Sequence, residues 1–322
     1  MKTSLSGIQP SGKPHLGNYL GAMRQHVELQ DSYQSILFIA DLHALTTVKD
    51  AEKMREQTLD IVASYLALGL DPAKTVFFKQ SSIPEHSELC WILDCLATIP
   101  FLERAHAWKD AQQKGKKEIS VGLFNYPILQ AADILLYQPD IVPVGQDQKQ
   151  HIEMTRDLAT RFNETFGETF KLPEPQIVEE VAVVPGTDGQ KMSKSYGNTI
   201  DIFAEEPILK KQVMSIVTDS TPLEEPKDPN TCHVFNIYKL IAPPEDTAQL
   251  SAKYQAGGFG YGEAKKLLLA TIHDHFGPAR LRHAELIQDK PLLQKTLENG
   301  AEKAKALASP TMNTVKKRIG YI

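Results

Sequence analysis

The chain has 322 residues, of which 42% are hydrophobic and 23% charged, and its formal net charge is −5. This composition excludes a disordered or fibrous chain and is typical of a globular protein long enough for more than one domain. A nucleic-acid partner would need a local basic surface, because the chain as a whole repels phosphate.

The three cysteines, Cys90, Cys95 and Cys232, form no C-x-x-C pair and cannot all pair with one another. We therefore expect a reducing compartment and no disulfide framework. His86, Cys90 and Cys95 are candidate metal ligands, but their loose spacing is more typical of side chains on one apolar helix. The N-terminus has no apolar signal-peptide region and the chain has no run of about 18 apolar residues, so we expect a cytoplasmic protein without a membrane partner.

The first predicted unit is a strand at residues 2–8, followed by a turn rich in Gly and Pro and then a helix. A helix N-terminus presents unpaired N–H groups to an anion, and Gly12 and Gly17 let the backbone approach a ligand closely. The spacing of Gly7 and Gly12 matches a phosphate loop, but Pro14 stands where that motif needs Ser or Thr. The turn therefore predicts a nucleotide site of another kind, with an ordinary βα turn as the alternative.

Strands and helices alternate in the first half of the chain. The next expected elements are a buried strand at residues 35–40, a helix that Asp50 caps and Gly69 ends, a strand at residues 75–78 and a helix at residues 85–96. This alternation predicts a doubly wound parallel sheet, in which ligands bind at the carboxyl ends of the strands. The turn at residues 12–18 and the Asp41-Leu42-His43 corner would then lie on the same edge.

Residues 109–117 form a polar, basic segment, for which a solvated surface loop is the default interpretation. A mobile lid whose lysines reach ATP phosphates or the acceptor end of a tRNA is the alternative. The following segment, residues 126–137, predicts a helix with Pro127 in its first turn. Asp133 lies among apolar neighbours in this helix, and burying such a carboxylate is costly unless another group pairs with it.

The next strand, at residues 141–144, leads into Gly145, Gln146 and Asp147. A glycine at a strand end followed by a carboxylate suits an acid that accepts hydrogen bonds from ribose hydroxyls, although an Asp that caps the next helix is the simpler alternative. Residues 187–195, T-D-G-Q-K-M-S-K-S, form a Gly-containing loop with two lysines and several hydroxyls. Such a loop is suited to closing on a polyphosphate.

Strand patterns end near residue 206, and the rest of the chain predicts helices. They are expected at residues 208–217, 234–241, 263–276 and 292–307, separated by Pro and Gly clusters. Candidate phosphate contacts in this part are Lys210, Lys211, Arg280, Arg282, Lys316, Lys317 and Arg318, although most basic residues on amphipathic helices only face solvent.

Two short motifs carry a family resemblance. His15-Leu16-Gly17-Asn18 resembles the HIGH signature of class I aminoacyl-tRNA synthetases, with Asn in place of the second His. The segment from Lys191 to Ser195, KMSKS, matches the second signature of that class at every position. Together with GIQPSG, GNY, AADILLY and the V-P-V-G-x-D-Q-x-x-H segment at residues 142–151, they make the whole chain similar to bacterial tryptophanyl-tRNA synthetases.

The resemblance implies a Rossmann-type α/β fold, a doubly wound parallel sheet, with a second, all-helical domain. Residues 1–195 would form the catalytic domain, residues 196–290 a helical anticodon-binding domain, and residues 291–322 a final helix that returns to the catalytic domain. It also implies a homodimer and ligation of L-tryptophan to tRNA(Trp) in two steps. ATP with Mg²⁺ would enter as a substrate, with no tightly bound cofactor, no protein-held metal and no DNA partner.

The family motifs assign roles residue by residue. By resemblance, the catalytic residues are His15, Asn18, Lys191 and Lys194. ATP would be bound by Gln9, Pro10, Ser11, Gly17, Asn18, Gly145, Gln146, Asp147, Val184, Lys191, Met192, Ser193, Lys194 and Ser195. Tryptophan would be bound by Asp133, Tyr126, Gln130, His43, Leu5, Val142, Val144 and Gln148.

The identity of the amino acid rests on Asp133, which can only accept hydrogen bonds when ionised, whereas an indole N–H can only donate. The phenol of tyrosine could also donate, and the Tyr126-x-x-x-Gln130-x-x-Asp133 spacing occurs in tyrosyl-tRNA synthetases, whereas tryptophan enzymes often carry Met where Gln130 stands. The DILLY and GNY segments favour tryptophan. A nucleotidyltransferase of the same superfamily would not need the helices after residue 206, and a non-catalytic paralogue would be expected to lack a signature lysine.

Overall fold

The computed structural model describes residues 1–105, 108–109, 112, 119–145, 148–177 and 184–322. Within them, parallel strands form a five-stranded sheet in the order β3-β2-β1-β4-β5. The strands are β1 (Thr3–Ile8), β2 (Gln34–Ile39), β3 (Thr75–Lys79), β4 (Ile141–Val144) and β5 (Glu174–Ile177). The predicted doubly wound parallel sheet is confirmed, and its strand order reverses between β1 and β4, where such sheets bind ligands.

Helices fill the connections between these strands and build the whole C-terminal part. They are α1 (Leu16–Asn18), α2 (Arg24–Leu29), α3 (Asp41–Ala44), α4 (Ala51–Ala67), α5 (Glu85–Asp94), α6 (Ile99–Glu103), α8 (Val121–Tyr137), α9 (Lys149–Phe166), α10 (Glu206–Met214), α11 (His233–Tyr238), α12 (Pro244–Ala256), α13 (Tyr261–Leu286) and α14 (Lys290–Arg318), with a π-helical turn at Tyr19–Met23 and 3₁₀ turns at Gln80–Ser82 and Lys194–Tyr196. No helix in the described ranges is both long and apolar enough to cross a membrane.

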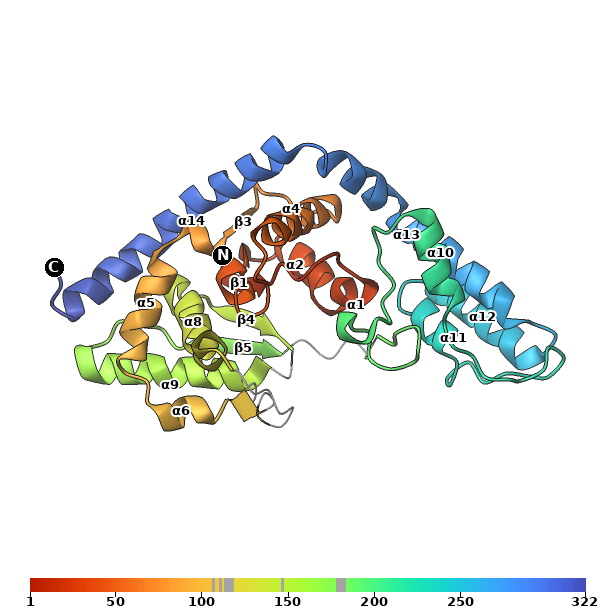
Figure 1. Ribbon diagram of the computed structural model, residues 1–322, viewed down its shortest axis with the longest axis horizontal. Coiled ribbons are helices and arrows are strands. Elements are labelled where there is room, and N and C mark those ends of the chain that lie inside the picture. Colours follow the sequence, from red (N-terminus) through yellow and green to blue (C-terminus); the bar gives the residue numbers. More distant parts are fainter. Residues whose placement is uncertain (106–107, 110–111, 113–118, 146–147, 178–183) are drawn as a thin grey trace.

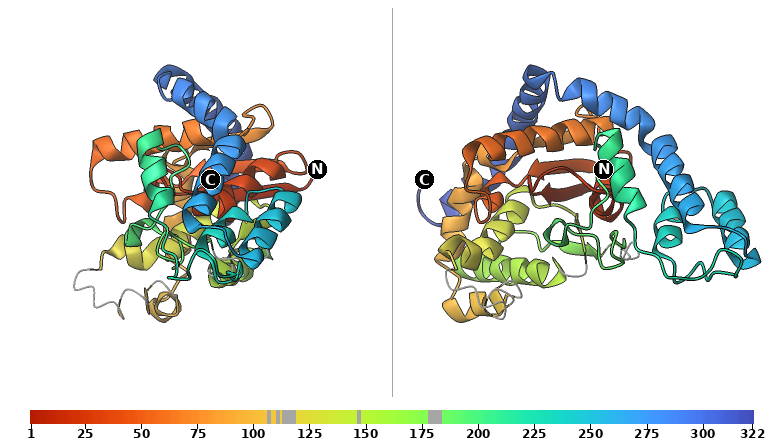
Figure 2. Two further views of the ribbon diagram at one scale, coloured as in Figure 1. Left: turned by 90° about the vertical axis from the view of Figure 1, so that its right-hand side faces the viewer. Right: turned by 45° about the vertical axis from the view of Figure 1, so that its right-hand side comes forward.

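Alternation along the strands divides the core of the sheet into two layers, because successive side chains of a strand point to opposite faces. Leu37 and Phe77 pack with α4 and the start of α14, whereas Phe38 and Phe78 pack with α5, α8 and α9. Figure 2 (right) shows α4 and α14 above the strands and α8 and α9 below them. Burial on both faces explains why the β2 segment is apolar without interruption.

The long helices α13 and α14 join the C-terminal helices to the sheet domain and arch over the molecule (Figure 1). Helix α14 covers β3, the edge strand, at Gly300. A Cβ atom built on Gly300 would lie 1.7 Å from the carbonyl oxygen of Phe77, so only glycine permits this approach. The helix thereby shields a strand edge that would otherwise be open to pairing with another chain.

A separate hydrophobic core occupies the C-terminal helices, and it includes two residues from the start of the chain. Leu16 and Leu20, on α1 and the π-helical turn that follows, pack with apolar residues of α10, α11 and α13. The glycine-rich turn at residues 12–18 is therefore held from both sides, by the sheet and by the helical part.

Several predicted boundaries were wrong. Helix α8 begins at Val121, where Ser120 caps it by accepting a hydrogen bond from the N–H of Leu123, so that Pro127 lies in mid-helix instead of in the first turn. Helix α13 extends well past the predicted residues 263–276, with Pro278 inside it. Strand β5 and helix α12 were not predicted, since Glu174–Ile177 shows no apolar alternation and Pro244–Ala256 begins with two acids and a proline.

Candidate active site

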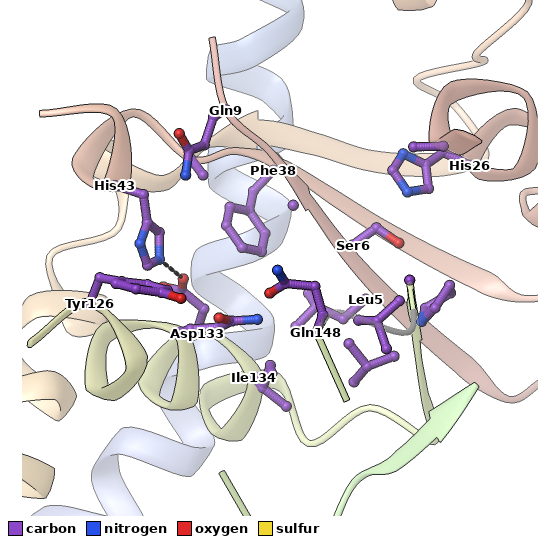
Figure 3. Close-up of a pocket in the computed structure, with 18 of the residues that line it drawn as sticks. Leu5, Ser6, Gln9, His26, Phe38, His43, Tyr126, Asp133, Ile134 and Gln148 are labelled. Carbon is purple, nitrogen blue, oxygen red and sulfur yellow. Dashed lines mark hydrogen bonds and ion pairs between the residues drawn. The ribbon is translucent and has the colours of Figure 1, made fainter. Parts of the chain in front are cut away.

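A cavity of about 560 Å³ opens between β1, β4 and α8 (Figure 3). Its lining includes all the residues that the sequence analysis assigned to tryptophan: Leu5, His43, Tyr126, Gln130, Asp133, Val142, Val144 and Gln148. Gln9 and Gly145, assigned to ATP, line the same cavity. One continuous space therefore joins the two predicted subsites, while their ligand-binding roles stay predictions.

Asp133 is the only Asp, Glu, Lys or Arg in the described lining of this cavity, and it is 1% exposed. Its Oδ1 accepts hydrogen bonds from Nε2 of Gln80 at 2.7 Å and from Nδ1 of His86 at 2.6 Å, and its Oδ2 pairs with Nε2 of His43 at 2.9 Å (Figure 3). Burial alone would raise the pKa of Asp133, but the hydrogen bonds and charges of His43 and His86 outweigh it and lower the pKa to about 2. The group is therefore an ionised acceptor at neutral pH.

A carboxylate offers about four acceptor sites, of which three are used here, two on Oδ1 and one on Oδ2. One acceptor position on Oδ2 therefore remains, and both Asp133 and His43 line the cavity. An apolar ring with a single N–H or O–H suits this lining, in which the walls Leu5, Phe38 and Val142 are buried and apolar.

His86 and Gln80 were not predicted as parts of this site. Both side chains are fully buried, and Nε2 of His86 also bonds to the hydroxyl of Tyr137 at 2.9 Å. The metal alternative for His86 is not supported by its surroundings: Cys90 is half-buried beside Asp94, Cys95 is exposed, and no group of His, Cys, Asp and Glu in the described residues is arranged to hold a metal.

A chain of hydrogen bonds also holds two of the other predicted tryptophan ligands in place. The hydroxyl of Tyr126 lies 2.7 Å from Nε2 of His151, and Nδ1 of the same ring lies 2.9 Å from Oε1 of Gln148. His151 is therefore a positioning residue. The sequence analysis includes it only as the last residue of the family segment at residues 142–151 and gives it no role. Of the predicted nucleotide ligands next to it, Gln146 and Asp147 lie outside the described residues, as does most of the 109–117 segment.

The HIGH-like turn forms a reciprocal cap at the start of α1. Nδ1 of His15 accepts from the N–H of Asn18 at 3.3 Å, and Oδ1 of Asn18 accepts from the N–H of His15 at 3.2 Å. Burial, followed by the charge of Lys194, lowers the pKa of His15 to about 4. The ring is therefore neutral at pH 7, and because Nδ1 accepts, its proton is on Nε2, where it can be donated to an anion.

The KMSKS segment lies directly against this turn. The N–H of Gly17 donates to Sδ of Met192 at 3.3 Å, and the N–H of Leu16 donates to the carbonyl of Ile200 at 2.8 Å. Met192 is buried and is held in turn by Val184, whose carbonyl accepts from its N–H at 2.9 Å. The two signature segments, far apart in sequence, thus form one structural unit.

Asn198 holds the KMSKS loop in shape, and the sequence analysis did not identify it. Its Oδ1 accepts from the N–H of Ser193 at 2.7 Å, and its Nδ2 donates to Asp188 and to the carbonyl of Lys191. Asn198 is 2% exposed. Within the loop, Ser193 caps the 3₁₀ turn by accepting from the N–H of Ser195.

The two signature lysines differ in position. Lys191 is exposed to solvent, whereas Nζ of Lys194 donates to the carbonyl of Ser11 at 3.0 Å and so reaches the turn that Gln9 and Pro10 begin. Both ammonium groups lie on segments that flank the HIGH-like turn. Positive charge is therefore available beside the N–H groups at the start of α1.

The basic residues proposed for phosphate contact fall into separate places. The guanidinium of Arg280 donates to the carbonyls of Ile202 at 2.6 Å and Ala204 at 2.7 Å, and its role as a phosphate ligand stays a prediction. Lys316 pairs with Glu88 at 2.9 Å on the sheet domain. The exposed residues on the helical part are Lys210, Lys211 and Arg282, whereas Lys316, Lys317 and Arg318 lie at the far end of α14.

Comparison with known proteins gives consistent matches over the whole chain. Residues 2–277 match the family described as tRNA synthetases class I (W and Y). The chain is 52% identical to the tryptophan–tRNA ligase of Fusobacterium nucleatum subsp. nucleatum, covering 100% of this chain and 99% of the relative, and 50% identical to that of Rhodopirellula baltica, covering 98% of each. The crystal structure of Campylobacter jejuni tryptophanyl-tRNA synthetase complexed with ADP and tryptophan superposes with a TM-score of 0.94 at 48% identity, covering 99% of both chains.

Proposed function

We infer that the chain, which belongs to the family of class I tRNA synthetases for tryptophan and tyrosine, is a tryptophan–tRNA ligase. It activates L-tryptophan with ATP and transfers the aminoacyl group to tRNA. Relatives that it matches over their full length are tryptophan ligases, which decides between the two amino acids that the family serves. Tyrosine, the alternative substrate suggested by Gln130, is therefore not supported.

The observation that carries the assignment of the site is the shared cavity, which has Asp133 and Tyr126 on one side and Gln9 and Gly145 on another. We propose that the indole N–H donates to Oδ2 of Asp133, with the ring against Leu5, Val142 and neighbouring apolar walls. The amino-acid carboxylate would then lie towards Gln9, where the α-phosphate of ATP must be. This geometry suits in-line attack, because both reactants share one space.

In the activation step, an oxygen of the tryptophan carboxylate forms a bond to the α-phosphorus while the bond to the β-phosphate oxygen breaks and pyrophosphate leaves. We propose that Lys191 and Lys194 neutralise charge on the departing pyrophosphate, which carries Mg²⁺ as part of the substrate. The neutral ring of His15 would donate from Nε2 to a phosphate oxygen, and Asn18 would help to hold the same group. Little covalent chemistry falls to the protein, so catalysis comes from position and charge.

In the transfer step, the terminal ribose hydroxyl of tRNA(Trp) attacks the activated carbonyl and AMP leaves. We propose that the helices after residue 206 bind the anticodon end, with Lys210 and Lys211 among the phosphate contacts, and that the enzyme works in the cytoplasm. A homodimer is supported by exposed apolar side chains on or beside elements that pack around α8. They are Leu45, Trp91, Ile99 and Val121, each more than half exposed.

ATP–pyrophosphate exchange with each amino acid in turn tests the proposal, and tryptophan should be strongly preferred. Lys191→Ala and Lys194→Ala should each lower the exchange rate by about 2–4 kcal/mol of transition-state stabilisation, with little change in tryptophan affinity. A double variant that exchanges at the parental rate would remove both lysines from the mechanism. Trp91→Glu should shift the mass in solution to that of a monomer if the apolar patch is the dimer surface.

A further inference from the structure

One face of helix α4 carries buried hydrogen-bond acceptors beside the KMSKS lysine. Oε1 of Gln57 and Oδ2 of Asp60 are shielded from solvent and accept no hydrogen bond from any described residue. Positions three apart on a helix lie on the same face, so these two oxygens belong to one surface. A buried acceptor without a donor costs free energy, which makes such a pair a site that attracts a donor.

Lys194 brings a flexible hydrogen-bond donor close to this surface. An ideal Cβ on Gly12 would lie 3.3 Å from Nε2 of Gln57 and 3.4 Å from Nζ of Lys194. The side-chain amide of Gln57 and the ammonium of Lys194 therefore both lie beside Gly12. In the structure that ammonium donates to the carbonyl of Ser11. A lysine side chain has four rotatable bonds and can exchange one acceptor for another over such a short span.

Charge favours this exchange. Desolvation lowers the pKa of Lys194, and the charges of Asp201 and Asp60 act in the opposite direction and favour the ammonium form. One oxygen of Asp201, Oδ2, accepts from Nε2 of Gln212 at 3.0 Å. Asp60 differs from it in carrying a buried oxygen, Oδ2, that has no hydrogen-bond donor among the described residues.

Asp60 faces a histidine from the helical part of the molecule. Nε2 of His283, on α13, lies 3.3 Å from Oδ1 of Asp60 without forming a hydrogen bond, and its ring stacks on Phe203 at 4.2 Å between centroids. Arg280, one turn earlier on α13, holds the backbone that follows the KMSKS loop. Helix α13 thus contacts both the carboxylate and the backbone that follows the loop carrying the lysine.

We propose that Asp60, with Gln57, is a positioning site that docks the ammonium of Lys194 and competes with the polyphosphate of ATP for it. The proposal rests on the role given above to Lys194. While the lysine is docked on α4 it is unavailable to ATP, so the apparent affinity for ATP is reduced by the fraction of molecules in the undocked state. Asp60 is thus a positioning residue that acts through Lys194 and needs no contact with the substrate.

The test measures ATP–pyrophosphate exchange in Asp60→Asn, which keeps the shape of the side chain and removes its charge. We expect KM for ATP to fall about three- to tenfold, with kcat changed less than about twofold and KM for tryptophan unchanged. Glu56→Gln is the matched control, because it removes the same charge from an exposed position on the same helix and should leave KM for ATP unchanged. Gln57→Met removes the other acceptor without a charge change and should act in the same direction, more weakly.

The same substitution in a Lys194→Ala background separates the explanations. If Asp60 acts through the lysine, Asp60→Asn should no longer change KM for ATP once Lys194 is absent. A decrease in KM that persists there would show that the carboxylate repels ATP directly and would overturn the docking site, as would an unchanged or increased KM in the single variant. Parental exchange in Lys194→Ala alone would instead refute the role of the lysine itself.

Discussion

Asp133 offers the most informative single substitution, because the structure gives this carboxylate two separable duties. It accepts three hydrogen bonds from Gln80, His86 and His43, and it leaves one acceptor position on Oδ2 towards the cavity. The first duty predicts an effect on stability. The second predicts an effect on which ring the enzyme activates.

Asp133→Ala would remove the partner of three buried donors at once. Each unpaired buried donor costs about 1–3 kcal/mol, and breaking a buried ion pair by removing one member costs about 3–5 kcal/mol. We therefore expect the free energy of unfolding to fall by about 3–5 kcal/mol, measured by urea denaturation. Such a variant confounds folding with catalysis, so the substrate test needs a milder change.

Asp133→Asn keeps the shape of the side chain and one acceptor oxygen but loses the charge. The parent enzyme should reject an indole-ring analogue without an N–H by as much as about 10⁴-fold in kcat/KM, because the analogue leaves the buried acceptor unpaired. In Asp133→Asn, exchange with tryptophan should fall while the discrimination against the analogue shrinks at least about tenfold. ATP binding, followed by its own KM, should persist.

Gln130→Met is the matched control on the same helix, one turn before Asp133. We expect it to retain a preference for tryptophan over tyrosine, since the N–H acceptor is intact. A parent enzyme that activates the N–H-free analogue as well as tryptophan would refute the indole contact. Equal losses with both substrates in Asp133→Asn would show that Asp133 only holds His43 and His86 in place.

Three other outcomes follow from the structure. Gly300→Ala should destabilise the fold by on the order of 3 kcal/mol, because its Cβ would meet the carbonyl of Phe77. Gly277→Ala, on α13 with open space around it, should stabilise the fold by about 0.5–1 kcal/mol in the same urea denaturation assay. Charge reversal of Lys210 and Lys211 should weaken tRNA charging and reduce its salt dependence while exchange stays intact, and loss of both activities would indicate misfolding instead. The pKa of His15 is about 4 in the fold and 6.5 in the unfolded chain, so the unfolded state binds more protons between these pH values. The free energy of unfolding should therefore fall by on the order of 2 kcal/mol as the pH drops from 6.5 to 4. The decrease should be smaller in His15→Gln.

The parts of the fold that could be predicted are those with a local physical signature. Strand β2 is a continuous apolar run because both of its faces are buried, and Asp50 caps α4 because its side chain accepts from the N–H groups of Glu52 and Lys53. Strand β5 has no such signature: it pairs only with β4, at the edge of the sheet, and its sequence contains Pro175 and a charged residue. Edge position permits both, so the pattern is lost.

The same division applies to the candidate site. Asp133 could be predicted because a lone acid in an apolar helix requires a partner, and the signature segments carry their residues in fixed spacing. The partners themselves come from other parts of the chain. Gln80 follows β3 and His86 is in the first turn of α5, and neither is marked by its neighbours in sequence as a partner of Asp133. Only the tertiary packing of these two segments against α8 brings them to one carboxylate.

Asn198 and Asp60 are the clearest examples of residues whose contacts could not be predicted from their spacing in the sequence. Asn198 lies beyond the KMSKS segment in a stretch without periodicity, yet it makes three hydrogen bonds that shape the loop. Asp60 occupies a position on α4 that the helical pattern assigns to a half-buried face, and its partner His283 is on a helix more than 200 residues later. Asn198 shapes the loop that carries both signature lysines, whereas the contact of Asp60 with His283 exists only when α4 and α13 are packed together. The predicted substrate contacts are therefore encoded in short motifs, whereas the groups that position those motifs come from other parts of the chain.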